Sequence, residues 1–160
     1  MPYRICKIIE LESGHMLSKS RDNCRFPHGH SRQVELILEA DELDCNDMVC
    51  DFSLLKAVLQ GLLESFDHAM YVNTSDPSYE MLLKTCGERL IGFANTDPTT
   101  EVIARTIFEK IDESLRTHGR RDDQLYPVAK NVRLVRVRVW ETSSCWAEYE
   151  RPGPAGSRAD

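Results

Sequence analysis

Alternating and helix-spaced hydrophobic positions divide the chain into four strands and two helices. A first strand is predicted over residues 3–12, which are rich in Ile and Tyr, and a second over residues 30–40. Residues 131–141 give the clearest strand, because three valines alternate there with two arginines and leave one apolar and one charged face. Residues 145–150 follow a Thr-Ser-Ser turn and are predicted to pair with that strand as a hairpin.

The two helices are predicted from apolar residues that recur every three or four positions. The first helix begins near Asp51 or Ser53, either of which can cap it, and ends at about residues 67–68. The second begins after Pro98 and ends at Gly119. Their apolar faces consist of Leu55, Val58, Leu59, Leu62 and Phe66 in the first helix, and of Ile103, Ile107, Ile111 and Leu115 in the second.

The order of these elements, β-β-α-α-β-β, predicts an α+β fold in which an antiparallel sheet carries two helices on one face. Residues 72–98 are punctuated by Asn, Pro and Gly and show no regular pattern. No repeat or linker divides the chain. We therefore expect one domain over residues 1–151, followed by a Pro/Gly-rich tail at 152–160 that is expected to be disordered.

Composition and charge limit the classes of partner. The chain has 160 residues, of which 41% are hydrophobic, and its net charge is −6. An acidic chain lacks the basic surface typical of proteins that bind nucleic acid or anionic membranes. No signal peptide and no stretch of about 20 apolar residues is visible, so we expect a cytoplasmic protein without membrane spans. Six cysteines are present without a Cys-x-x-Cys pair, which argues against a four-cysteine zinc site.

Three histidines are candidates for a metal site. His28 and His30 stand two apart at the entrance of a predicted strand, so both side chains point to one face. His15 lies on the far side of the same loop and is a candidate third ligand. Catalytic zinc usually takes three protein ligands and keeps a fourth position for water or substrate. The alternative is an ordinary pair of surface histidines.

Cys24 precedes this pair by four residues, and two interpretations of it stay open. As a fourth zinc ligand it would make the site closed and structural. As a free thiol beside a cation it would have a lowered pKa and act as a thiolate base or nucleophile.

Two acidic positions also have alternative interpretations. Asp67 and His68 form a possible acid–base couple, or simply the end of the first helix. Glu141 shares the apolar face of its strand, and a buried carboxylate is costly unless it is paired. It therefore pairs with a cation or anchors a ligand that carries N–H donors, unless the end of the strand is solvated.

Taken in order, these segments resemble the 6-pyruvoyl-tetrahydropterin synthase / 6-carboxytetrahydropterin synthase family. The resemblance rests on Ser-Gly-His15, Cys-x-x-x-His-Gly-His at 24–30, Met-Val-Cys-Asp-Phe-Ser-Leu-Leu-Lys at 48–56, Phe-Asp-His at 66–68 with Asn73, Pro-Thr-Thr-Glu at 98–101, and Trp-Glu-Thr at 140–142. It implies the tunnelling fold (T-fold), in which subunits of a homo-oligomer, a hexamer or tetramer, pool their sheets into a β-barrel with active sites between subunits.

The resemblance also implies roles for individual residues. His15, His28 and His30 match the Zn²⁺ ligands, Cys24 the catalytic thiol, Asp67 and His68 its partner couple, and Glu141 the carboxylate that anchors the pterin, with Thr99, Thr100 and Glu101 near that pocket. The implied protein is a zinc-dependent lyase acting on 7,8-dihydroneopterin triphosphate.

The three residues between Cys24 and His28 resemble the bacterial carboxy-forming branch, which releases acetaldehyde and triphosphate and supplies queuosine (7-deazapurine) biosynthesis. The alternatives are the pyruvoyl-forming enzyme on the same substrate and a non-catalytic, zinc-stabilised homologue. Ser13-Gly14 and Ser31-Arg32 depart from the family pattern. Because Arg32 puts a positive charge where a ring is expected, the pocket wall or the strand pairing is predicted to differ there.

Overall fold

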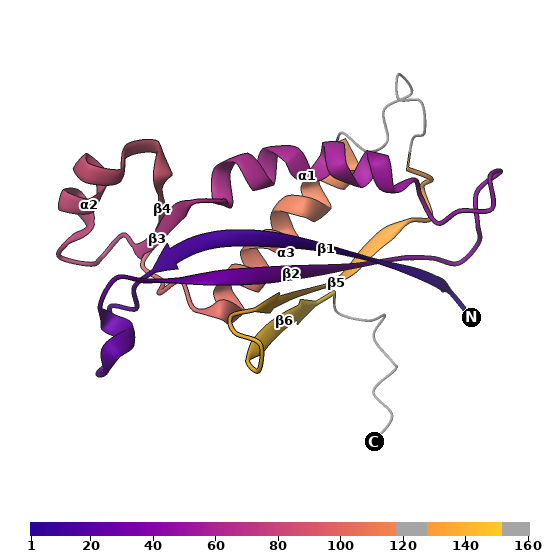
Figure 1. Ribbon diagram of the computed structural model, residues 1–160. Helices are drawn as coiled ribbons and strands as arrows, with labels where there is room; N and C mark the ends of the chain where they lie inside the picture. The colour runs from indigo at the N-terminus through magenta and orange to yellow at the C-terminus, as the bar shows by residue number, and fades with distance from the viewer. Residues whose placement is uncertain (118–127, 152–160) are drawn as a thin grey trace.

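A curled six-stranded sheet with the strand order β4-β3-β1-β2-β5-β6 organises the molecule (Figure 1). The computed structural model describes residues 1–117 and 128–151. The strands are β1 Tyr3–His15, β2 His28–Ala40, β3 Ala69–Asn73, β4 Leu90–Phe93, β5 Arg133–Trp140 and β6 Trp146–Glu150. The helices are α1 Phe52–Phe66, α2 Tyr79–Cys86 and α3 Thr100–Thr117, with short 3₁₀ turns at Asn23–Arg25 and Gly87–Arg89. The predicted helix end at Gly119 and the predicted tail at 152–160 lie outside the described residues.

The long antiparallel pair β1–β2 extends further than its sequence pattern predicts. The two strands pair in an unbroken register from Tyr3 opposite Ala40 to His15 opposite His28. Residues 13–15, expected in a loop because of Ser and Gly, are therefore strand. The small side chains of this segment are tolerated because its backbone pairs on both sides, with β2 and in parallel with β3.

The region 72–98 contains structure that the pattern does not reveal. Strand β3 pairs in parallel with β1, and β4 pairs in parallel with β3, with α2 between them in the sequence. The sheet is therefore mixed, and the predicted antiparallel arrangement holds for β1, β2, β5 and β6. Strands of this length show neither a clear alternation nor a helical period, because nearly every side chain of β3 is buried.

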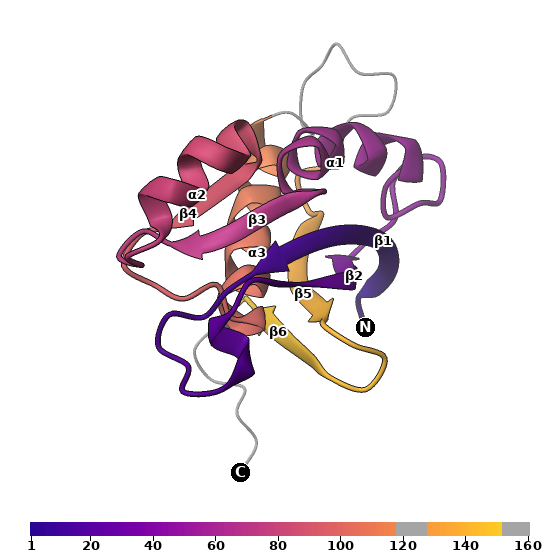
Figure 2. The same cartoon turned by 60° about the vertical axis from the view of Figure 1, so that its left-hand side comes forward.

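The predicted placement of two helices on one face of the sheet is confirmed. Figure 2 shows α1 and α3 on the same side of the β1–β2 pair. The core between them joins Leu36 of β2 with Leu59 of α1 and Ile107 of α3, each of which is at most 1% exposed. No helix in the described ranges combines the length and apolar character needed to cross a lipid bilayer.

Replacing Leu59 by Ala tests this core. Leu59→Ala removes a buried side chain and is expected to lower the free energy of unfolding by about 2–5 kcal/mol. Lys56→Ala on the exposed side of α1 is the matched control and should change it by less than about 0.5 kcal/mol. Denaturant unfolding of both variants measures the difference, and equal values would mean that α1 does not pack on the sheet in this way.

Candidate metal centre and its cavities

Three imidazoles converge at the end of the β1–β2 pair. His15 faces His28 across the two strands, and His30 lies two residues further along β2, on the same face. Their ring centroids are 4.5 Å apart for His15 and His28, 5.2 Å for His15 and His30, and 5.1 Å for His28 and His30. One ring nitrogen from each lies within 4.8 Å of the other two.

Backbone carbonyls fix which nitrogen of two of these rings carries the proton. Nδ1 of His15 lies 2.8 Å from the carbonyl oxygen of Pro98, and Nδ1 of His28 lies 2.8 Å from that of Phe26. A carbonyl only accepts hydrogen bonds, so each Nδ1 must donate, and the Nε2 atoms keep their lone pairs. Burial lowers the pKa of His15 to about 4, which keeps its ring neutral at physiological pH.

Glu141 directs its carboxylate at these lone pairs. It follows β5 on the face of the fully buried Val137 and Val139, as the alternation predicts. Its Oε1 lies 3.3 Å from Nε2 of His15 and 3.5 Å from Nε2 of His30. Because Nε2 of His15 carries no proton, this contact brings two electron-rich atoms together, and a shared cation would relieve it.

These residues fit a bound Zn²⁺ ion. Neutral imidazoles are preferred zinc ligands, and the carbonyls behind His15 and His28 are the outer-shell acceptors that orient such ligands. The buried Nε2 atoms of His15 and His30 make no hydrogen bond to any described residue. Three protein ligands leave one coordination position for a water or a substrate oxygen.

Cys24 is not part of this cluster. It lies in the exposed 3₁₀ turn Asn23–Arg25, outside the group of described side chains whose ligand atoms come within 4.8 Å of one another, which consists of His15, His28 and His30. Partial desolvation and the nearby Asp22 carboxylate raise the pKa of the Cys24 thiol. The geometry therefore gives no support to Cys24 as a fourth ligand.

Asp67 and His68 form the couple that their adjacency suggests. Oδ2 of Asp67 lies 2.9 Å from Nδ1 of His68, and its Oδ1 accepts a 2.8 Å hydrogen bond from the backbone of Glu12. Burial disfavours the charged carboxylate, but the bonds from Glu12 and His68 outweigh it and hold the pKa of Asp67 below its usual value. The couple follows the end of α1 at Phe66, so the helix-end interpretation also describes its position.

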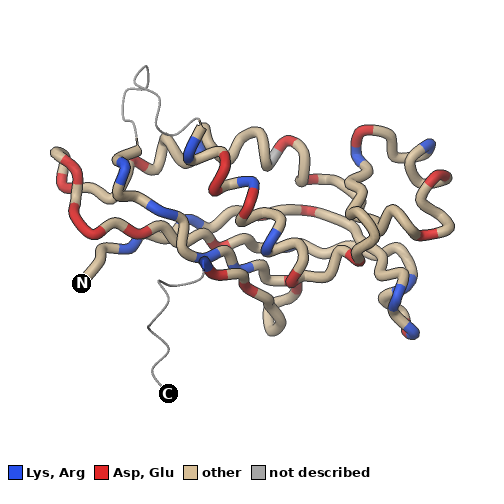
Figure 3. Tube along the Cα trace, turned by 180° about the vertical axis from the view of Figure 1, so that it is seen from behind, with Lys and Arg blue, Asp and Glu red and all other residues tan. Residues whose placement is uncertain are grey.

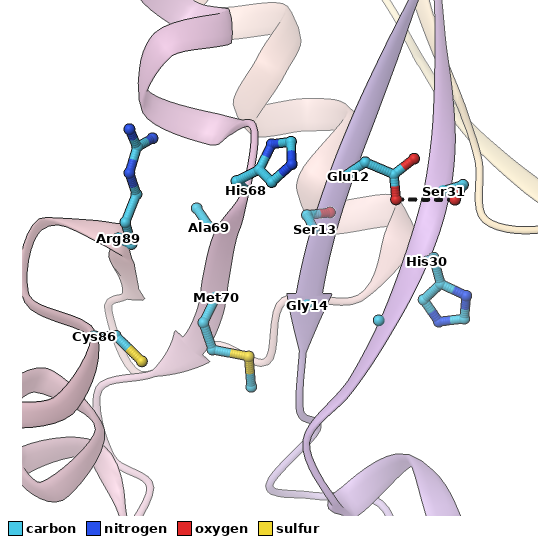
Figure 4. A pocket seen from close by; sticks show the side chains of 11 residues that line it. Glu12, Ser13, Gly14, His30, Ser31, His68, Ala69, Met70, Cys86 and Arg89 are labelled. Atoms are coloured by element: carbon cyan, nitrogen blue, oxygen red, sulfur yellow. Dashed lines mark hydrogen bonds between the residues drawn. The ribbon is translucent and has the colours of Figure 1, made fainter.

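Two cavities flank the end of the β1–β2 pair. The first, of ≈370 Å³, is lined by His15 and Glu141 together with the start of α3, where Thr99, Thr100 and Glu101 lie. The second, of ≈520 Å³, lies over the neighbouring ends of β2, β1 and β3, and its lining includes His30 and His68 (Figure 4). Within one chain the structure therefore brings Glu141 and the residues 99–101 together, and it places the Asp67–His68 couple beside a different cavity.

Sequence reasoning missed Asp97, which helps to orient the site. Asp97 accepts hydrogen bonds from the side chain of Asn73 and the backbone of Lys19, both at 2.8 Å, and so fixes the segment that carries the Pro98 carbonyl. An Asp-Pro pair before a helix is an ordinary turn signal, so only the spatial contact with His15 reveals its role.

Arg32 is the position at which the sequence predicts a changed pocket wall or strand pairing. Its side chain is fully buried on the helix-covered face, and its backbone keeps the normal register opposite Leu11. The strand pairing is therefore regular at this position, and the Arg32 side chain lies behind the cavity-lining residues. Burial lowers the pKa of the Arg32 guanidinium.

Solved structures of pterin synthases share this fold. The chain aligns with 6-pyruvoyl tetrahydropterin synthase from Caenorhabditis elegans at a TM-score of 0.63 and 20% identity, covering 95% of this chain and 97% of that one. An uncharacterized protein from Wolinella succinogenes aligns at a TM-score of 0.76 and 21% identity, covering 95% and 99%. The subunit fold predicted from the resemblance is thus confirmed.

The sequence comparisons identify the family itself. The model of the 6-pyruvoyl tetrahydropterin synthase family matches residues 4–152, and the chain belongs to this family. Two of its curated relatives are both named 6-carboxy-5,6,7,8-tetrahydropterin synthase. The relative from Aquifex aeolicus is 29% identical, with 94% of this chain and 99% of that one covered. The relative from Rickettsia conorii is 27% identical, with 88% and 94% covered.

Acidification of the metal-free protein tests the buried, neutral state of His15. The folded-state pKa of about 4 lies below the ordinary value of 6.5, so the unfolded chain binds the proton first. Neutral His15 therefore contributes fully to the free energy of unfolding above pH 6.5. This contribution, on the order of 3 kcal/mol, is lost as the pH falls toward 4. His15→Asn, which keeps an N–H for Pro98, should show a smaller loss in urea unfolding at each pH. Identical pH profiles would contradict the assignment.

Proposed function

We propose that this chain is a zinc-dependent 6-carboxy-5,6,7,8-tetrahydropterin synthase that converts 7,8-dihydroneopterin triphosphate and water to 6-carboxytetrahydropterin, acetaldehyde and triphosphate. The observation that carries the proposal is the convergence of His15, His28 and His30 on one point beside the Glu141 carboxylate, at the wall of a cavity. The names of the curated relatives support the carboxy-forming branch. We further propose that the reaction belongs to queuosine biosynthesis, which the resemblance supports, and that the enzyme is cytoplasmic with one domain over residues 1–151.

In this proposal the three histidines hold the Zn²⁺ ion, whose chemistry is that of a Lewis acid lowering the pKa of the hydroxyl groups of the substrate side chain. His15 and His28 present their Nε2 atoms because Pro98 and Phe26 hold the opposite nitrogens. The site is thereby pre-organised before any ligand enters.

Glu141 is proposed to anchor the pterin ring. A pterin presents adjacent ring N–H and amino donors, which a carboxylate accepts as a bidentate pair. Glu141 faces the ≈370 Å³ cavity together with residues 99–101 at the start of α3. A flat bicyclic ring held there would place its side chain toward the histidines.

Two groups are proposed to move protons. Cys24 removes a proton from the substrate side chain, and His68, oriented by Asp67, carries out the second proton transfer. The raised pKa of Cys24 in the single chain means that its activation requires positive charge supplied on assembly or on ligand binding.

The distribution of these groups over the molecule supports an oligomeric enzyme. His68 lines one cavity, Glu141 lines the other, and Cys24 lines neither. Strands β4 and β6 are the edges of the described sheet and are free to pair with further strands. We propose a homo-oligomer, a hexamer or tetramer, whose pooled sheets form a barrel and whose active sites combine residues from neighbouring subunits.

A local concentration of positive charge supports a polyphosphate substrate despite the acidic chain. The connection between β1 and β2 contains three basic residues, Lys19, Arg21 and Arg25, and one acidic residue, Asp22. Figure 3 shows these basic positions gathered at the end of the molecule away from the N-terminus. The connection leads directly into His28, so it lies next to the proposed reaction site.

A second candidate is the 6-pyruvoyl-forming reaction on the same substrate. The name of the matching family and the likeness to the Caenorhabditis elegans enzyme favour it. The two reactions differ in product mass and in the release of acetaldehyde, so a product analysis separates them.

Metal analysis tests the histidine site. Purified protein is expected to contain about one zinc per chain, and His28→Ala should lower zinc affinity by at least about 100-fold, because even outer-shell changes cost 10–100-fold. His68→Ala is the control that should retain zinc, since His68 lies outside the cluster. Competition with a chromogenic chelator gives both affinities, and unchanged zinc binding by His28→Ala would exclude the site.

Mass spectrometry of the reaction products tests the activity. With 7,8-dihydroneopterin triphosphate the protein should yield 6-carboxytetrahydropterin, with acetaldehyde trapped by a hydrazine reagent. Cys24→Ala should lower turnover by about 10²–10⁴-fold, the usual worth of a proton-transferring group, while zinc content stays the same. A pyruvoyl product would favour the second candidate. Turnover that survives in Cys24→Ala would reject the thiol assignment, and no turnover by the wild type would favour a non-catalytic homologue.

A further inference from the structure

Arg32 places a permanent charge inside the core. It is 0% exposed and is among the largest fully buried side chains of the described chain. It shares a face of β2 with His30 and with Val34, which are two residues before and after it. A buried guanidinium is costly unless an anion or acceptor compensates it, and leaving such a charge unpaired costs several kcal/mol.

Two acceptor atoms lie close to the Arg32 guanidinium, but only one of them is available. Nη2 is 3.2 Å from Nδ1 of His15 and 3.4 Å from Oε1 of Glu141. Nδ1 of His15 already donates its proton to Pro98, so it cannot also accept from an arginine. Glu141 is therefore the group that compensates the charge, while Nε and Nη1 make no hydrogen bond within the described ranges.

The pair is asymmetric in its access to solvent. Glu141 keeps 28% of its side chain exposed and lines the ≈370 Å³ cavity, whereas Arg32 is completely covered and does not line it. A ligand in the cavity can thus touch the carboxylate but not the guanidinium. Arg32 acts on such a ligand only through the position and charge of Glu141.

We propose that Arg32 is a positioning residue that holds the Glu141 carboxylate from behind and fixes it for recognition of a ligand with adjacent N–H donors. The inference rests on the proposed function, because it takes the pterin ring as that ligand. Oε1 of Glu141 lies 3.4 Å from Nη2 of Arg32, at about the same distance as the Nε2 atoms of His15 and His30. Without Arg32, the carboxylate loses its permanent cation and one of the contacts that fix its position.

A double-mutant cycle separates positioning from a merely structural role. Arg32→Met removes the charge at similar volume, and such replacements of buried charges often preserve folding. Glu141→Gln removes the proposed point of action, and the double variant completes the cycle. Arg32→Lys tests rescue by a positive charge, and Arg136→Met is the matched control, because Arg136 pairs with Glu35 on the opposite face of the sheet.

The readout is the dissociation constant of 7,8-dihydroneopterin, measured by fluorescence, with zinc content and melting temperature recorded for every variant. Arg32→Met should weaken binding by about 10–100-fold, the range for a hydrogen bond to a charged group. It should have no further effect in the Glu141→Gln background. The dissociation constant of Arg32→Lys should stay within about 3-fold of the wild-type value. That of the control variant Arg136→Met should equal the wild-type value.

Several outcomes would overturn the inference. These are unchanged binding by Arg32→Met, an equal loss in both backgrounds, or a loss in Arg32→Lys as large as in Arg32→Met. Arg32→Gln replaces the methionine variant in the same cycle if the latter does not fold. Failure of the wild type to bind dihydroneopterin would instead reject the proposed function, and the inference with it.

Discussion

The antiparallel register of β1 and β2 is the constraint on which the site depends. Because His15 pairs with His28 at the very end of the two strands, the His-x-His spacing places the third ring on the same face. A slip of one residue would turn one strand's side chains to the opposite face and scatter the ligands. The apolar residues further along both strands fix this register, since Val34, Leu36 and Leu38 must face the helices for the core to close. The packing of the core thus determines the geometry of the metal centre some distance away.

The register brings the rings together, but contacts from distant segments give them their chemistry. The Pro98 carbonyl comes from a position 83 residues beyond His15, and Glu141 comes from the far end of β5. The contact with Pro98 fixes the tautomer of His15, and the Glu141 carboxylate places a negative charge beside the rings. The site is therefore polar, only partly buried and only partly compensated within the chain, which is typical of a place that stability alone would not favour and that ligand binding completes.

The difference between local patterns and contacts from distant segments explains what the sequence could predict. The long strands and both major helices follow from periodicity, and so does the inward direction of Glu141 after Val137 and Val139. The short parallel strands β3 and β4 were missed because so few residues, nearly all covered in β3, carry no period. The orientation of His15 by Pro98 and the burial of Arg32 against Glu141 were beyond prediction, since both depend on segments that are adjacent only in space. Partial desolvation and the Asp22 carboxylate raise the pKa of Cys24, a local effect that spacing along the sequence does not reveal.

The two cavities give the strongest physical argument for assembly under the proposed function. His15 and Glu141 line one cavity, and His30 and His68 line the other, so the end of the β1–β2 pair forms a wall between them. A rigid sheet cannot bend to bring Asp67 and His68 round to Glu141, because β1 is hydrogen-bonded to β2 on one side and to β3 on the other. A substrate that needs all of these groups must therefore obtain some of them from another chain. In the part of the chain that the structure describes, β4 and β6 form the outer edges of the sheet, where such a chain can add its strands.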